Sequence, residues 1–164
     1  MKKILISALL AAAAYVGAAA MPRAEYPRPQ FEREHWQNLN GEWTYELDPV
    51  QTGHERGMMN SVGFDGRIIV PFAPESELSG VGHKEFIPSI WYQREITVPQ
   101  AWEGKDILLN FGAVYYVSEI YVDGKFVDRH HGGSDSFTVD ITKFVKQGEN
   151  LVALEIFRWC NYQV

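Results

Sequence analysis

Hydrophobic and polar residues alternate along much of the chain between residues 41 and 157, and this alternation predicts β-strands. In GEWTYELD, residues 41–48, the apolar positions Trp43, Tyr45 and Leu47 recur with a period of two, which is typical of a half-buried strand. Further strands are predicted in RIIVPF (67–72), WYQREITVP (91–99), DILLNFGAV (106–114), SEIYVDGKFVDRHH (118–131), HGGSDSFTVDI (131–141) and LVALEIF (151–157).

The segments between these strands predict turns and two long loops. Asp123-Gly124 separates two apolar runs and indicates a hairpin, because glycine accepts the positive φ of a tight turn. Residues 49–66 and 73–90 are irregular, and loops of this length in a compact domain are often functional. No amphipathic helix longer than a turn or two is evident. About eight strands, with turn signals roughly every 10 residues, predict an all-β sandwich.

In the strand WYQREITVP, the two faces differ in character. Tyr92, Ile96 and Val98 lie on one face, whereas Gln93, Glu95 and Thr97 lie on the other. This pattern predicts a strand with one apolar and one polar face.

The amino terminus predicts export. Residues 1–20 begin with two lysines, continue with an apolar run and end in three alanines, which is the pattern of a secretory signal peptide. The run is too short and too rich in alanine for a membrane span. Residues 21–35 hold three prolines and are interpreted as an extended arm, so 36–164 are left as the sandwich domain. The expected location is periplasmic or secreted.

The charge of the chain bears on its expected partners, and its cysteine content bears on how the fold is stabilised. Cleavage after Ala20 would remove Lys2 and Lys3 but no acid, and the formal net charge would go from −6 to −8. Such a surface offers no basic patch for a nucleic acid. Cys160 is the single cysteine, so the core must hold the fold without an internal disulfide.

No constellation of residues predicts a metal, a cofactor or a catalytic centre in this chain. His130 and His131 are adjacent on a strand and point to opposite faces, and the other histidines are scattered. Glycoside hydrolysis needs two carboxylates about 5–10 Å apart, and no pair is distinguished by its surroundings. Glu119, like the other acids, is interpreted as part of a solvated surface. The many aromatic residues are interpreted as ordinary core.

Three stretches resemble the amino-terminal domain of glycoside hydrolase family 2, which includes β-galactosidases, β-glucuronidases and β-mannosidases. They are WQNLNGEWTYELD (36–48), SIWYQREITVPQAWEGKDILLNFGAV (89–114) and SEIYVDGKFVDRHHGGSDSFTVDITKFVKQGENLVALEI (118–156). The resemblance covers about residues 28–159 and implies a jelly-roll, galactose-binding-like β-sandwich that serves as a sugar-binding domain.

The same resemblance implies that catalysis belongs elsewhere. In the family this domain precedes an immunoglobulin-like domain and a TIM barrel, and the barrel carries both catalytic glutamates. The chain is therefore expected to contain no catalytic residue and to act on a carbohydrate only within a full-length enzyme, of the β-galactosidase type, that hydrolyses terminal β-glycosides.

The last residues carry the implied sugar contacts. FRWCN, residues 157–161, resembles an Arg-Trp-Ser-Asp-Gly segment of the β-galactosidase branch. Arg158 and Trp159 match, whereas Cys160 stands in the serine position and Asn161 in the acid position. Arg158, Trp159 and Asn161 are the candidate sugar-binding residues. Related sequences continue with a further strand, so we expect the isolated chain to have an open sheet edge and marginal stability.

Two other functions are compatible with the sequence. The chain could be a stand-alone carbohydrate-binding module, for which binding of a polysaccharide by the purified chain would be diagnostic. It could also be an interaction domain whose open edge is completed by a strand from another chain, for which a stable dimer or a co-purifying fragment would be diagnostic.

Overall fold

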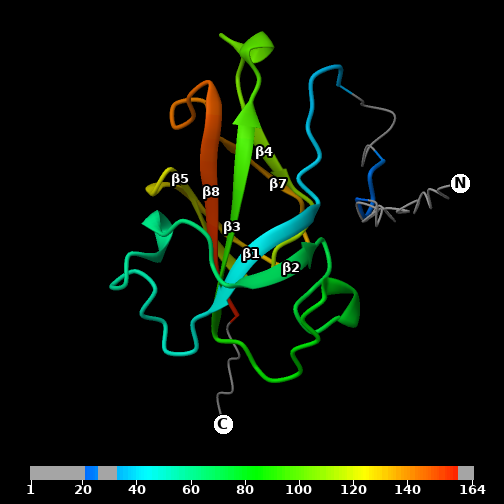
Figure 1. The fold of residues 1–164 in the computed structure, drawn as a ribbon, viewed down its shortest axis with the longest axis vertical. Coiled ribbons are helices and arrows are strands. Elements are labelled where there is room, and N and C mark those ends of the chain that lie inside the picture. The colour runs from blue at the N-terminus through cyan, green and yellow to red at the C-terminus, as the bar shows by residue number, and fades with distance from the viewer. Residues whose placement is uncertain (1–20, 26–32, 159–164) are drawn as a thin grey trace, which may run out of the picture.

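Eight strands run through the part of the chain that the computed structural model describes, residues 21–25 and 33–158 (Figure 1). Every segment predicted to form a strand contains one, and the helices are three 3₁₀ turns of three residues each, so the all-β class is confirmed. The strands are β1 (Gly41–Leu47), β2 (Gly66–Val70), β3 (Ser89–Val98), β4 (Leu108–Phe111), β5 (Val117–Val122), β6 (Lys125–His131), β7 (Phe137–Asp140) and β8 (Gly148–Phe157). The helices are η2 (Met58–Asn60), η3 (Glu77–Ser79) and η4 (Gln100–Trp102).

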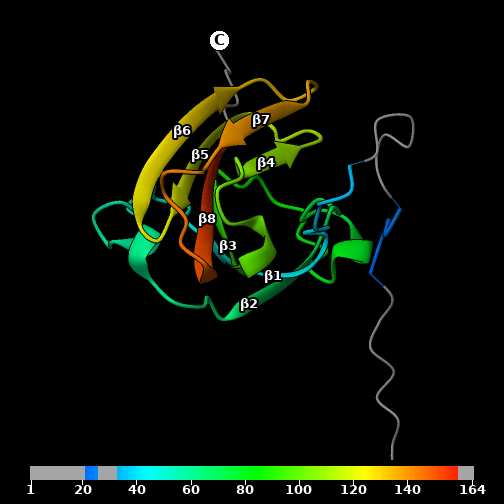
Figure 2. The ribbon, with the colours of Figure 1, turned by 90° about the horizontal axis from the view of Figure 1, so that it is seen from above.

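The strands form two antiparallel sheets of unequal size. One sheet has six strands in the order β2-β1-β3-β8-β5-β6, and the other pairs β4 with β7. Figure 2 shows β4 and β7 together on one side of the larger sheet. β8 lies in the middle of the six-stranded sheet and pairs with both β3 and β5. Among the described strands, β4 and β7 pair only with each other, so the second layer of the sandwich is much smaller than the first.

The core lies between the two sheets and follows the alternation in the sequence. Ile90, Ile120 and Leu154 come from the large sheet and Leu109 and Val139 from the small one, and all five are nearly inaccessible to solvent. Burial of apolar area at this interface is the main favourable term in folding.

The predicted hairpin joins β5 to β6. Asp123 and Gly124 both have positive φ, 46° and 74°, as a tight turn of the primed type requires. A Cβ at Gly124 would lie 1.8 Å from Oδ1 of Asn60, so a larger residue here would also have to displace the Asn60 side chain.

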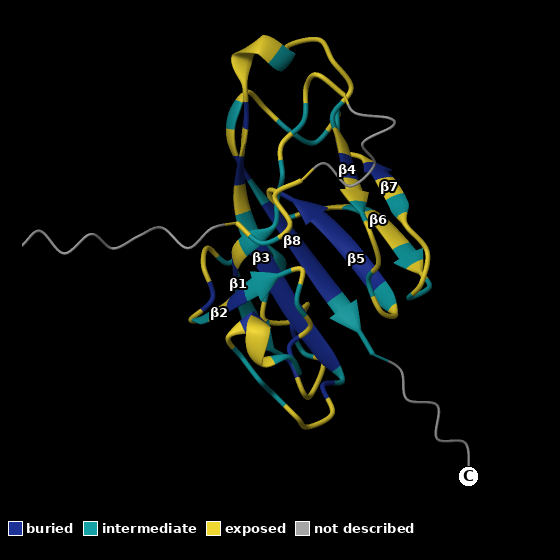
Figure 3. Cartoon of the chain, turned by 90° about the vertical axis from the view of Figure 1, so that its right-hand side faces the viewer, coloured by how far each residue is buried: buried dark blue, intermediate teal, exposed yellow. Residues whose placement is uncertain are grey.

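A loop covers the outer face of the large sheet, which is the face turned away from β4 and β7. This covering loop, residues 48–65, connects β1 to β2, and its Met58 and Phe64 pack on Trp91 and Tyr121. Figure 3 shows the result, since β3, β5 and β8 are buried along most of their length. The face of β3 that carries Gln93 is therefore covered in the first half of the strand, although the sequence places polar residues on it.

Gln93 on β3 holds the covering loop to the sheet. It lies on the predicted polar face, yet it is only 1% exposed. Its amide nitrogen donates to the carbonyls of Met58 (3.0 Å) and Ser61 (2.7 Å), and its amide oxygen accepts from the N–H of Gly63 (3.2 Å). A buried amide satisfied in this way stabilises one loop conformation.

The predicted signal peptide, residues 1–20, lies outside the described residues. The described parts of the predicted arm, 21–25 and 33–35, contain neither helix nor strand. Among the described residues, no helix has the length and apolar character that crossing a membrane would require.

Candidate functional site

Arg158, one of the three predicted sugar-binding residues, follows the last residue of β8. Its N–H donates to the carbonyl of Pro88 (3.0 Å), and its guanidinium forms an ion pair and hydrogen bond with Glu75 on the loop between β2 and β3. Trp159 and Asn161 lie outside the described residues. The structure thus brings Arg158 together with Glu75, 83 positions away, a partner that sequence reasoning did not identify.

The Glu75–Arg158 pair lies at the end of the sheet and is partly exposed. The side chain of Arg158 is 26% exposed and that of Glu75 is 35% exposed. Burial acts to raise the pKa of Glu75, but the hydrogen bond and the charge of Arg158 outweigh it and hold the pKa below its ordinary value. A guanidinium has five N–H donors, and among the described residues Glu75 is the side chain that pairs with the guanidinium of Arg158.

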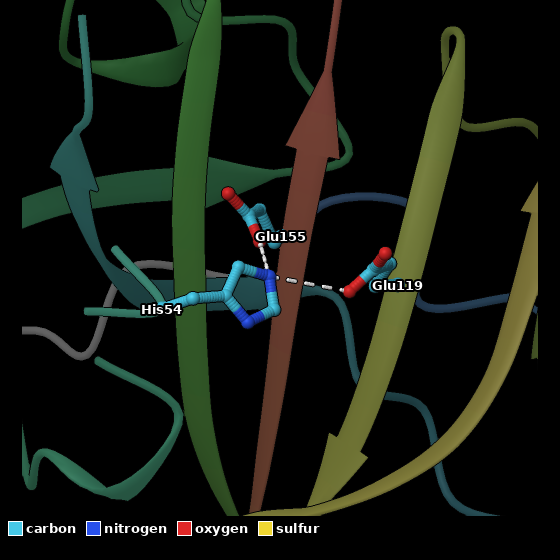
Figure 4. A group of neighbouring side chains, drawn as sticks. All are labelled: His54, Glu119 and Glu155. Carbon is cyan, nitrogen blue, oxygen red and sulfur yellow. Dashed lines mark ion pairs between the residues drawn. The ribbon is translucent and has the colours of Figure 1, made fainter. Parts of the chain in front are cut away.

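A second group of polar side chains lies under the covering loop. His54 comes from this loop, Glu119 from β5 and Glu155 from β8, and we call these three residues the outer-face cluster. Figure 4 shows the imidazole of His54 directed toward both carboxylates. Nε2 of His54 lies 2.7 Å from Oε2 of Glu155 and 3.4 Å from Oε2 of Glu119. Antiparallel pairing sets the two glutamates directly opposite each other, since Glu119 on β5 is the register partner of Glu155 on β8.

Neighbouring side chains orient the two carboxylates. The hydroxyl of Tyr121 and the guanidinium of Arg129 both donate hydrogen bonds to Glu119. The hydroxyl of Ser89 donates to Oε1 of Glu155 (3.0 Å). Both oxygens of Glu119 therefore accept a hydrogen bond, Oε2 from Tyr121 and Oε1 from Arg129, whereas Ser89 engages Oε1 of Glu155. The Oε2 atom of each glutamate faces His54.

Burial is severe for the two glutamates and moderate for the side chains of His54 and Arg129 that contact them. Glu119 is 3% exposed and Glu155 is 1% exposed, whereas the side chains of His54 and Arg129 are about half exposed. The interpretation of Glu119 as part of a solvated surface is therefore wrong. A buried carboxylate requires hydrogen bonds or counter-charges, and both glutamates have them.

The environments of the two glutamates shift their pKa values in opposite directions. Burial raises the pKa of Glu155, against the opposing effects of His54 and Ser89. Burial also acts to raise the pKa of Glu119, but the hydrogen bonds from Tyr121 and Arg129 outweigh it, so that pKa is lowered.

The opposite pKa shifts of Glu119 and Glu155 do not make these two residues the acid and the nucleophile of a glycosidase. The two carboxylates of a retaining glycosidase lie about 5–5.5 Å apart with the sugar between them. Here the imidazole of His54 contacts both Glu119 and Glu155, and the covering loop closes over them. A sugar ring cannot reach the two carboxylates in this arrangement.

The local structure of the loop explains how His54 reaches the sheet. Asp48, fully buried at the end of β1, accepts hydrogen bonds from the N–H groups of Thr52 (3.1 Å) and Gly53 (2.6 Å). A Cβ at Gly53 would lie 2.2 Å from Nε1 of Trp91, so only glycine allows the backbone to approach this closely. The turn around Asp48 thus brings His54, the residue after Gly53, over the sheet.

The sequence does carry a signal for the outer-face cluster. Glu155 stands alone as an acid inside the apolar run LVALEIF, and Glu119 occupies the paired position on the neighbouring strand. A single acid in a strand that is buried on both faces requires a partner. The identity of that partner, a histidine on a loop 101 positions before Glu155, depends on how the loop folds back.

Aromatic residues divide between core and surface. Trp43, Trp91 and Tyr92 are at most 9% exposed, which confirms the prediction that they are core. Tyr115 and Tyr116, before β5, are 57% and 42% exposed.

A family model matches more than half of the chain. Residues 75–164 match the model described as "Glycosyl hydrolases family 2, sugar binding domain". This stretch includes Glu75, Glu119, Glu155 and Arg158.

Individual proteins match over longer or shorter stretches. A β-glucuronidase of Felis catus is 30% identical over 122 residues, 68% of this chain and 19% of the relative. A β-galactosidase of Thermoanaerobacter pseudethanolicus is 38% identical over 68 residues, 40% of this chain and 9% of the relative. The structure of a Lactobacillus rhamnosus β-glucuronidase superposes with a TM-score of 0.68 at 32% identity, over 74% of this chain and 21% of that one. The chain thus spans about a fifth or less of the length of these proteins.

Proposed function

Since the chain belongs to family 2 of the glycosyl hydrolases, in which its residues form the sugar-binding domain, we propose that it is the amino-terminal domain of an exported enzyme that hydrolyses terminal β-glycosides. The observation that carries the proposal is the match of residues 75–164 to that domain. The β-sandwich and its likeness to family 2 enzyme structures support it further. Bond cleavage belongs to two glutamates in a following barrel domain, and this chain supplies one wall of the sugar site.

The first candidate substrate is a terminal β-galactoside. Two observations favour it: the resemblance of Arg158-Trp159 to the β-galactosidase segment, and the 38% identity to a β-galactosidase over 68 residues. In this proposal Arg158, held by Glu75, lies at the rim of the barrel and donates hydrogen bonds toward the sugar, together with Trp159 and Asn161.

The second candidate substrate is a terminal β-glucuronide. Relatives named β-glucuronidases match longer stretches of the chain, such as the 122 residues shared with the feline protein. The carboxylate of a glucuronide would pair favourably with a cation such as Arg158, because a guanidinium binds a carboxylate in a bidentate manner.

Hydrolysis assays test the proposal and separate its two substrates. The full-length protein that contains this chain is assayed with the 4-nitrophenyl β-glycosides of galactose and glucuronic acid. We expect faster release of nitrophenol from the galactoside. Preference for the glucuronide would replace the first substrate with the second, and a folded full-length protein inactive on both would overturn the function.

The isolated chain provides the matching control. We expect no turnover from it on either substrate, because the catalytic glutamates are proposed to lie outside it. Measurable hydrolysis by the isolated chain would contradict the proposal that the catalytic glutamates lie in another domain. Recovery of the full-length protein outside the cytoplasm, processed after Ala20, would support export, whereas an intact amino terminus on a cytoplasmic protein would argue against it.

A further inference from the structure

We propose that His54, Glu119 and Glu155 bind a single divalent cation of the zinc type, which fastens the covering loop to the six-stranded sheet. This inference concerns the outer face of the sandwich and does not depend on which sugar, if any, the protein hydrolyses. The three residues come from three separate elements, the loop 48–65, β5 and β8, so a shared ion would join segments far apart in the sequence.

The positions of the ligand atoms fit a small coordination sphere. One nitrogen of His54 and one carboxylate oxygen from each glutamate all lie within 4.8 Å of one another. Ligands about 2.0–2.1 Å from a tetrahedral zinc ion are separated by roughly 3.3 Å. The 3.4 Å between His54 and Glu119 already matches this spacing, and the 2.7 Å between His54 and Glu155 needs an outward shift of about 0.6 Å to match it. His54 is about half exposed and lies on a loop, so this shift involves a side chain that is not enclosed on all sides.

An independent observation points to a ligand at this place. Oε2 of Glu155 is fully buried and receives no hydrogen bond from any described residue. Nε2 of His54 lies 2.7 Å from this oxygen in an ion-pair contact, and a shared cation would lie between these two atoms. A buried carboxylate oxygen left without a donor is costly, and a cation at this position would satisfy it.

The surrounding groups act as the outer shell of such a site. Ser89 donates to Oε1 of Glu155, and Arg129 donates to Oε1 of Glu119, which leaves both Oε2 atoms directed at His54. Hydrogen bonds of this kind orient carboxylate ligands in metal sites. The hydroxyl of Tyr121 also donates to Oε2 of Glu119, and a carboxylate oxygen can accept this bond while it coordinates a metal. Three protein ligands leave one position of a tetrahedral zinc ion for a water molecule.

The donor set selects the class of cation. One imidazole nitrogen and two carboxylate oxygens suit Zn²⁺ and neighbouring transition metals. Ca²⁺ requires six to eight oxygen ligands and Mg²⁺ an octahedral shell with several waters, so neither fits three ligands of which one is nitrogen.

Zinc titration of matched variants tests the site. The full-length protein is freed of metal by chelator dialysis and titrated with Zn²⁺ in a calorimeter, as wild type and as His54→Gln, Glu155→Gln and His35→Gln. His54→Gln removes a half-exposed ligand and is expected to fold, which circular dichroism verifies. His35→Gln removes an exposed histidine outside the cluster and serves as the control. Titration with Co²⁺ reports coordination through its visible absorption.

We expect the wild type and His35→Gln to bind one more equivalent of Zn²⁺ than His54→Gln, or to bind it at least about tenfold more tightly. The corresponding Co²⁺ absorption is expected to disappear in His54→Gln, and Ca²⁺ is expected to produce no response. Equal stoichiometry and affinity in folded wild type and His54→Gln would overturn the proposal and leave the cluster as an ion-pair network. If Glu155→Gln fails to fold, His54→Gln alone decides.

Discussion

The two faces of the six-stranded sheet are both buried, but by different means. The inner face packs apolar side chains, such as Ile120 and Leu154, against the small sheet. The outer face is covered by the loop 48–65, and beneath that loop lie Gln93, Glu119 and Glu155 as well as apolar residues.

The two faces are therefore expected to stabilise different things: the fold as a whole and the conformation of the covering loop. Apolar packing is non-directional, and its contribution grows with the area removed from water. A buried polar group contributes little net free energy when its hydrogen bonds are formed, but it is costly to bury without a partner. Such groups therefore favour the one arrangement of the loop that provides their partners. We therefore expect the inner face to dominate the free energy of unfolding and the outer face to determine the conformation of the covering loop.

Truncation on the inner face should have the largest effect. Ile120 is fully buried in the core, and Ile120→Ala is expected to lower the free energy of unfolding by about 2–5 kcal/mol through lost transfer energy and a cavity. Denaturant titration of the full-length protein measures this difference. Val62→Ala removes an exposed side chain from the covering loop and should change the stability by less than about 0.5 kcal/mol. Equal effects of the two substitutions would contradict the assignment of the core.

Removal of a polar contact on the outer face should have an intermediate and local effect. Gln93→Ala deletes the partner of three backbone groups in the covering loop and is expected to cost about 1–3 kcal/mol. It should also accelerate amide exchange in residues 48–65 more than elsewhere. Glu95→Ala, an exposed position on the same strand and face, is the matched control. Unchanged exchange of the loop in Gln93→Ala would argue against its role as an anchor.

The smallest effect is expected at the exposed rim of the sandwich, where Glu75 pairs with Arg158. Because the folded pKa of Glu75 is lowered, its charged form stabilises the protein above the unfolded pKa, and this contribution is lost as the pH falls through the folded value. Glu75→Gln should therefore cost less than about 1 kcal/mol at neutral pH, and the difference from wild type should shrink on acidification. Unfolding titrations between pH 7 and pH 3 measure it. Glu77→Gln, exposed on the same loop, is the matched control, and a trend equal to that of Glu75→Gln would contradict the pairing.

The strands, the hairpin and the apolar core could be predicted from the sequence because each depends on local patterns. A period of two places alternate residues such as Trp43 on the core side, and Asp-Gly between two strands favours the positive φ values that Asp123 and Gly124 have. Family membership could be predicted for the same reason, since short motifs in a set order carry it.

The candidate sites could be predicted only in part. Arg158 was predicted as a sugar contact from the resemblance, and its partner Glu75 became evident only once the loop between β2 and β3 was placed beside the end of β8. Glu119 was misinterpreted as solvated because its position on β5 alternates like that of a surface residue. The alternation identifies the face on which a side chain lies, but not what covers that face.

The sequence by itself determined the class of fold, the order of the strands along the chain and the family, because strand formation and turn chemistry depend on residues close in the chain. The tertiary structure decided which polar residues are buried and with which partners. His54 meets Glu119 and Glu155 because the covering loop folds back over a sheet whose strands β5 and β8 are distant in sequence from it. Such contacts depend on long-range packing and burial, which no local pattern of residues encodes.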